Sequence, residues 1–175
     1  HGRGEGKGND RAAPQRRSIR THHDSRQPGV TAAHATAAAT TTVLEARDVY
    51  RFLAEKWNFS VFTRIADSEQ QHYTVIGTQL KKYNIADPVV SDEAGVYADQ
   101  RLASMYAELT TKGSLSLKDA IEVGVMIEKQ DIADLETALA TKKLDLKRVY
   151  NNLMTASFSH LDSFEYSLEI LDSLN

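Results

Sequence analysis

The sequence predicts an all-α protein: an up-down four-helix bundle with one extra short helix and an extended N-terminal arm. Apolar residues recur every three or four positions along four long stretches, which is the periodicity of amphipathic helices. No long stretch shows the alternation of apolar and polar residues that is typical of a strand. Short turns separate the four stretches, apart from one longer crossover between the second and the third, and this connectivity is typical of a bundle.

The expected helices are placed by their start and stop signals. Thr42 and Glu45 have the spacing of a capping box, so we expect the first long helix to begin at Thr42. Asn84 can end the second long helix in a left-handed conformation. Ser116 and Asp119 give the third long helix a capping box of its own. The expected helices span residues 42–57, 61–83, 99–111, 117–140 and 144–174, and the short extra helix is the one at 99–111.

Residues 1–40 differ from the rest of the chain in charge and composition. They carry seven basic and three acidic residues, a net charge of +4, whereas residues 41–175 have a net charge of −7. Ile19 and Val30 are the only aliphatic or aromatic side chains larger than alanine in this arm. Such a segment cannot bury enough surface to offset its ordering entropy. We therefore expect residues 1–40 to be disordered alone and to become ordered on neighbouring subunits, and residues 41–175 to form the bundle.

Composition excludes several classes of function. The chain has no cysteine, so disulfides and thiolate metal sites are excluded. No apolar run approaches the roughly 20 residues needed to span a bilayer. The arginines of the arm are diluted by glycine and alanine and lack interleaved aromatic residues, so nucleic acid is not an expected partner. No Gly-x-Ser-x-Gly or phosphate-binding loop supports nucleophilic catalysis.

Two expectations concern partners and location. A polar arm that becomes ordered only on neighbouring subunits favours self-assembly, as a homo-oligomer or a filament joined through residues 1–40. The chain begins at His1 rather than at methionine. An upstream segment removed by a signal peptidase would leave such a start, so we expect an exported, extracellular protein, with a cytoplasmic location as the alternative.

Polar residues interrupt the apolar stripes of three helices at a similar depth. Glu69 and His72 lie on the stripe of the second long helix, and Glu128 interrupts the stripe of the third, with Asp131 at its margin. His160 lies in the middle of the stripe on the fourth helix. Buried charges need partners or a metal, so we expect these side chains to meet in the core.

The histidine count strengthens the hypothesis of a metal site. Four of the six histidines lie in the arm, and the two in the body, His72 and His160, both occupy a mid-stripe position. Two imidazoles with two or three carboxylates are ligands for non-haem iron, manganese or zinc. The alternative interpretation is that each is an ordinary core residue bonded to its neighbours.

The first helix should supply the fourth side of the site. Glu45 shares a face with Val49 and Phe52 and could point inward as a ligand. Its alternative role is to close the capping box with Thr42. Asp48 is a further candidate, although Arg47 and Arg51 would give it partners at the surface.

Five short motifs follow one another along the body of the chain. They are Ala-Arg-Asp-Val-Tyr at 46–50, Ser-Glu-Gln-Gln-His at 68–72, Asp-Pro at 87–88, Ile-Glu-x-x-Asp-Ile-x-Asp-Leu at 127–135 and Ser-x-x-His-Leu-x-x-Phe at 157–164. Together they resemble an uncharacterised prokaryotic family within the ferritin-like superfamily, and the resemblance covers residues 43–168 and not the arm.

The resemblance implies a ferritin-like bundle with a di-metal carboxylate centre. Glu69 and His72 match the Glu-x-x-His of the second helix of the superfamily, and Glu128 matches the glutamate of the third. The fourth helix usually repeats Glu-x-x-His, but here the pair is Ser157 and His160. Glutamates expected just before Ala-Arg-Asp are replaced by Thr41, Thr42 and Val43. These departures leave one ion, two ions or none as alternatives, with iron expected first and manganese or zinc next.

Two functions follow from this sequence. The first is a metal-binding, ferritin-like protein whose buried site, formed by Glu69, His72, Glu128, His160, Asp131 and Glu45, acts on iron, oxygen or peroxide. The second is a structural subunit of an extracellular filament or other homopolymer that keeps only a vestigial metal site. The sequence does not decide whether the protein is an enzyme.

Overall fold

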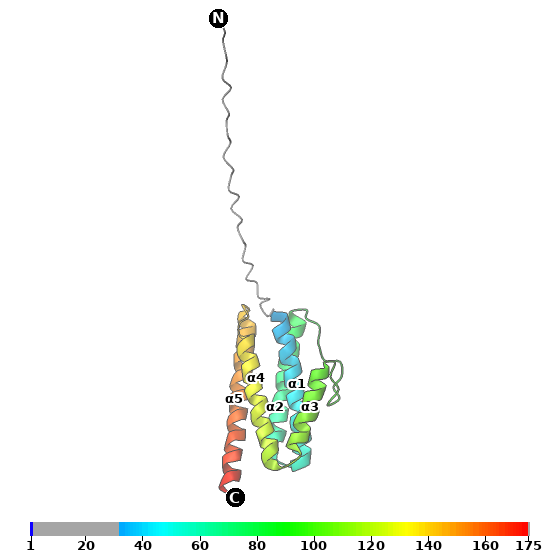
Figure 1. Cartoon of the computed structure of the whole chain (residues 1–175), viewed down its shortest axis with the longest axis vertical. Coiled ribbons are helices and arrows are strands. Elements are labelled where there is room, and N and C mark those ends of the chain that lie inside the picture. Colours follow the sequence, from blue (N-terminus) through cyan, green and yellow to red (C-terminus); the bar gives the residue numbers. More distant parts are fainter. Residues whose placement is uncertain (2–31, 175) are drawn as a thin grey trace.

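The computed structural model describes residue 1 and residues 32–174, and within this part of the chain the secondary structure is helical throughout, without a strand (Figure 1). The prediction of an all-α fold is confirmed. The helices are α1 (Ala32–Trp57), α2 (Ser60–Lys82), α3 (Gln100–Gly113), α4 (Leu117–Ala138) and α5 (Leu144–Ser173).

The long helices pack as two antiparallel pairs that lie side by side. The chain turns sharply between α1 and α2 and again between α4 and α5, so each pair is a helical hairpin (Figure 1). α1 packs on α4, and α2 packs on α5, which closes the bundle. The short α3 lies against α1 and α4. The crossover of residues 83–99 runs along the outside of α1 before it reaches α3 (Figure 1).

Most predicted helix ends agree with the structure to within about two residues. Ser116 caps α4, because its hydroxyl accepts a hydrogen bond from the backbone N–H of Asp119 at 3.0 Å. Asn84 has a φ of 52°, the left-handed conformation expected after α2. These local signals depend on neighbouring residues alone, which is why the sequence was sufficient to predict them.

The predicted start of the first helix was wrong. α1 begins at Ala32, ten residues before Thr42, and Thr42 donates its hydroxyl to the carbonyl of Ala38 instead of capping the helix. The run of alanines has the highest intrinsic helix propensity. Ala35 and Ala39 are buried in the core, and the buried Thr36 shares a 2.7 Å hydrogen bond with Tyr150 of α5. Residues 32–40 are therefore part of the bundle, while residues 2–31 lie outside the described chain.

Two apolar clusters fill the core, one toward each end of the bundle. The first contains the aromatic residues Tyr50, Phe62 and Phe164 together with aliphatic residues of α1, α2 and α4. The second is built around Ile76, Leu135, Leu146, Tyr150 and Leu153, and its α1 side is formed by Ala35, Ala39 and Val43. Along α2, α4 and α5 most of the buried residues between these clusters are polar, so the polar candidates lie in a layer between two apolar regions.

A close approach of α4 and α5 borders this layer. A Cβ atom at Gly124 would lie 2.7 Å from two ring carbons of Phe164. Phe164 is fully buried, and its ring packs against Tyr50 and Phe62 at centroid distances of 5.4 and 5.5 Å. Because residue 124 is a glycine, α4 can approach α5 closely, and Glu128, one turn further along α4, then faces α5.

In the part of the chain that is described, no helix has the length and apolarity needed to cross a membrane.

Candidate metal centre

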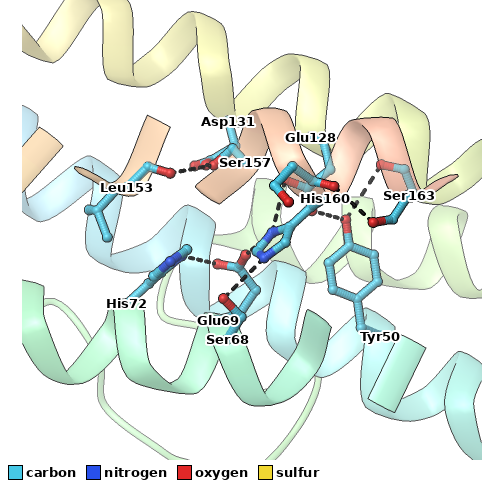
Figure 2. A network of polar contacts seen from close by, with 12 residues as sticks. Tyr50, Ser68, Glu69, His72, Glu128, Asp131, Leu153, Ser157, His160 and Ser163 are labelled. Carbon is cyan, nitrogen blue, oxygen red and sulfur yellow. Dashed lines mark hydrogen bonds and ion pairs between the residues drawn. The ribbon is translucent and has the colours of Figure 1, made fainter. Parts of the chain in front are cut away.

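Three helices contribute polar side chains to the layer between the two apolar clusters (Figure 2). α2 contributes Glu69 and His72, α4 contributes Glu128, and α5 contributes His160. All four residues are at most 9% exposed. They fall on the apolar stripes of their helices, so the packing that forms the bundle also points them inward. The predicted meeting of Glu69, Glu128 and His160 in the core is confirmed.

Three side-chain atoms converge at the centre of the layer. His160 Nδ1 lies 3.1 Å from Oε1 of Glu69 and 3.5 Å from Oε2 of Glu128. One ligand atom from each of the three residues lies within 4.8 Å of the others. None of these three atoms has a hydrogen-bond partner of acceptable geometry in the described chain. Buried polar atoms are rarely left unsatisfied, and a cation between them would satisfy all three.

The outer atoms of the same residues are held by hydrogen bonds. Tyr50 donates its hydroxyl to Oε1 of Glu128 at 2.7 Å. Nε2 of His160 contacts the hydroxyl of Ser68 at 3.0 Å. Nδ1 of His72 contacts Oε2 of Glu69 at 3.1 Å, and the His72 ring stacks on His160 with centroids 5.8 Å apart. These contacts fix the direction of the three central atoms, as the outer partners of metal ligands do.

Asp131 lies beside the three-atom group and is engaged by α5. Ser157 donates its hydroxyl to Oδ2 of Asp131 at 2.6 Å, and both residues are buried (Figure 2). Burial, followed by the charge of Glu69, raises the pKa of Asp131 to about 7. The Ser157–Asp131 pair thus occupies the place where the resemblance leads one to expect a glutamate on the fourth long helix.

The electrostatics of the centre link its histidine and carboxylates. Burial opposes the charged form of His160, but the contacts with Glu128 and Glu69 outweigh it and raise the pKa of His160 to about 9. Burial would raise the pKa of Glu69, yet its contacts with His160 and His72 lower it. For Glu128, burial and the repulsion from Glu69 dominate and raise the pKa. Without a cation, the centre therefore depends on a proton held by His160.

Glu45 and Asp48 lie on α1 outside this group. Glu45 is 1% exposed and lines a separate pocket between α1, α3 and α4. Asp48 was expected to be paired at the surface, but it is buried: Arg47 donates to its Oδ1 at 2.9 Å, and Tyr97 of the crossover donates to its Oδ2 at 2.9 Å. The structure thus brings Glu69, Glu128 and His160 together and places the two candidate carboxylates of α1 elsewhere.

Two supporting residues of the centre, Tyr50 and Ser68, were not predicted from the sequence. Tyr50 lies on the apolar face of α1, where a tyrosine is indistinguishable from a core aromatic residue. Ser68 precedes Glu69 on α2, and its contact with His160 of α5 spans 92 residues of sequence. The signal that could have identified Tyr50 is its hydroxyl, because a buried tyrosine usually requires a hydrogen-bond partner.

Residues 43–172 match the family model of an uncharacterized protein domain, DUF2202. The chain belongs to this family. The chain is 45% identical over 120 residues to the uncharacterized protein MJ0754 of Methanocaldococcus jannaschii, a match that covers 68% of this chain and 65% of that protein. Its fold is similar to the crystal structure of the hypothetical protein MJ0754 from Methanococcus jannaschii, with a TM-score of 0.78 at 39% identity, covering 80% and 81% of the two chains.

The candidate centre lies inside the part of the chain that matches the DUF2202 model. Glu69, Glu128 and His160 all fall within residues 43–172, and so do Tyr50 and Ser157. The first eleven described residues of α1, 32–42, fall outside the matched region. The family description names no activity, so function has to be argued from the site itself.

Proposed function

We propose that this protein is a ferritin-like metal-binding protein that holds one divalent ion, iron in the first place, between Glu69, Glu128 and His160. The observation that carries the proposal is the set of three buried, mutually facing ligand atoms without hydrogen-bond partners among the described residues. His160 Nδ1 contacts Glu69 and Glu128 as an ion pair, at 3.1 and 3.5 Å, but without the geometry of a hydrogen bond, and a cation would give all three atoms a direct bond.

The chemistry of the donors favours a particular class of ion. Two carboxylates and one imidazole suit iron, manganese or zinc, and the absence of sulfur ligands disfavours copper(I). Three protein ligands leave coordination positions for water or a small substrate. A bound ion of this class would supply Lewis-acid chemistry and, as iron or manganese, redox chemistry with oxygen or peroxide.

The protein's own residues prepare the site for an ion. Tyr50 holds Glu128, and Ser68 and His72 hold His160 and Glu69, so the ligands need little rearrangement. The two apolar clusters that flank the layer exclude bulk water and lower the local dielectric. Ser157 and Asp131 are already bonded to each other, which favours a single ion over two.

Metal analysis of matched variants tests this function. Protein purified without chelator should contain about one iron, manganese or zinc ion per chain, and metal-free protein should melt at a higher temperature when the ion is restored. A ligand that saturates its site at about 100 Kd stabilises the folded state by roughly 2.7 kcal/mol. Glu128→Gln should abolish both effects, and Glu136→Gln, an exposed change on the same helix, should preserve them. A melting temperature that does not respond to any of the three ions would contradict the proposal.

A second proposal, that the protein assembles through its arm and acts outside the cell as a structural subunit, is supported by charge. Residues 1–31 carry a net charge of +4 and residues 32–175 a net charge of −7, so the arm of one subunit is attracted to the body of the next. Deletion of residues 1–31 spares α1 and should leave a folded monomer, measured by light scattering. Assembly that persists after this deletion would refute the proposal, and recovery of the tagged full chain inside cells alone would refute an extracellular role.

A further inference from the structure

A second buried carboxyl group lies in a pocket that is separate from the metal centre. The pocket has a volume of about 150 Å³ and lies between α1, α3 and α4. Its buried lining includes Glu45, Leu109 and Ile127, while Met105 and Met126 are 37% and 51% exposed and form the rim. A cavity of roughly this volume holds a molecule the size of benzene.

Glu45 is the charged residue in the lining of this pocket. Its Oε1 is buried and accepts no hydrogen bond from the described residues. The adjacent cation Arg47 is engaged elsewhere, by Asp48 at 2.8 Å and by Asp92 at 2.7 Å. An unpaired buried carboxyl group costs free energy that a hydrogen-bond donor in the pocket would recover.

The groups around Glu45 disfavour its ionised form. Burial and then the charge of Asp48 raise the pKa of Glu45 to about 8. Tyr97 of the crossover also lies near this carboxyl, and the charge of Glu45 contributes to raising the pKa of the Tyr97 hydroxyl. The lining residues from α3 and α4 carry no ionisable group. Apart from Arg47, whose charge is engaged by Asp48 and Asp92, the neighbours named here are anionic or neutral, and a positive charge is the missing complement of Glu45.

We propose that this pocket binds small primary alkylammonium ions, with the ammonium group paired to Glu45 and the alkyl chain packed against the methionine, leucine and isoleucine side chains. An ammonium group brings three hydrogen-bond donors and a charge opposite to that of the carboxylate. The thioether side chains at the rim are flexible and adapt to alkyl chains of different shape. A hard metal ion would find a single carboxylate among mostly apolar walls, which is too few oxygen ligands. The inference is independent of the metal centre, because the two sites share no residue.

The first test compares two ligands of nearly equal size and different charge. n-Butylammonium and n-butanol are titrated calorimetrically into the full-length protein at pH 8. We expect n-butylammonium to bind at least tenfold more tightly than n-butanol. Glu45→Gln should remove this preference and Glu55→Gln, an exposed change on the same helix, should keep it. Equal affinities in the wild-type protein, or a preference that survives Glu45→Gln, would overturn the proposal.

The pH dependence provides a second test, which needs no variant. Binding of the cation requires Glu45 to lose its proton, so with a pKa of about 8 the affinity for n-butylammonium should rise about fifty-fold from pH 6 to pH 8. The affinity for n-butanol should not rise. The carboxyl carbon resonance of Glu45, followed by NMR, should show a pKa at least one unit lower with saturating n-butylammonium. This measurement decides the matter if Glu45→Gln fails to fold, and an unchanged pKa would overturn the inference.

Discussion

The hydroxyl of Tyr50 donates a 2.7 Å hydrogen bond to Oε1 of Glu128, and the other oxygen of that carboxylate faces His160. Burial and the neighbouring Glu128 raise the pKa of Tyr50, so the hydroxyl remains a donor. This contact joins α1 to the metal centre although no carboxylate of α1 reaches the three-atom group. α1 therefore supplies a residue that orients a ligand in place of a ligand of its own.

Removing this hydroxyl should weaken metal binding more than it weakens the fold. Tyr50→Phe leaves Oε1 of Glu128 without its donor, which should cost about 1–3 kcal/mol of stability and roughly 10- to 100-fold in metal affinity. Tyr150→Phe is the matched control, since it removes a buried hydroxyl bonded to Thr36 at the far end of the core. Calorimetric metal titration and thermal unfolding of both variants separate the two effects. Equal metal affinities in the two variants would show that Tyr50 does not position Glu128.

Metal binding should release a proton from the centre. The contacts with Glu128 and Glu69 outweigh burial and give His160 a pKa of about 9, so its imidazole is protonated at pH 7 before the ion binds through Nδ1. Affinity should therefore rise about tenfold per pH unit below pH 9 and level off above it. Titrations in buffers of different ionisation enthalpy should give about one proton released per ion at pH 7. An affinity that does not change between pH 6 and 8 would contradict binding through His160.

The ligand residues could be predicted from sequence because helical periodicity alone puts them on buried stripes. Glu69, Glu128 and His160 interrupt apolar repeats at similar depth, and four antiparallel helices bring similar depths together. The start of α1 could not be predicted in this way. Its alanine- and threonine-rich first turns have the composition of the arm, and their burial depends on Tyr150, more than a hundred residues away.

The burial of Asp48 could not be predicted for a related reason. Its partner Tyr97 lies in the crossover at 83–99, and Asp92 of the same segment pairs with Arg47. An irregular segment has no periodicity that would place it on a particular helix. Helical periodicity also does not distinguish whether Glu45 faces α3 or the metal centre, because the buried face of α1 contacts α3 as well as the helices that form the centre.

Two glycines of equal chemistry should respond to alanine in opposite ways. Gly124→Ala puts a methyl group 2.7 Å from the ring of Phe164, which is fixed by Tyr50 and Phe62, and overpacking of this kind costs about 1–3 kcal/mol. Gly77→Ala on α2 meets no atom within 4 Å, so it should stabilise the protein by up to about 1 kcal/mol through helix propensity. Urea unfolding measures both changes, and stabilisation by both variants would show that α4 and α5 are not in close contact at Gly124.

A loss of stability between pH 4.5 and about pH 8 should depend on Glu45. Its pKa is about 8 in the folded protein against 4.5 as its ordinary value, so the folded state binds the proton more tightly. The free energy of unfolding must then fall as pH rises from 4.5 to 8, because the unfolded state releases this proton first. Glu45→Gln should have little effect at pH 4 and should stabilise the protein at pH 9 by a few kcal/mol, because a pKa difference of one between the folded and unfolded states corresponds to about 1.4 kcal/mol. Glu55→Gln, an exposed change on α1, should leave the pH dependence of urea unfolding as it is in the wild-type protein. A difference between Glu45→Gln and wild type that is the same at pH 4 and pH 9 would mean that Glu45 ionises normally in the folded protein.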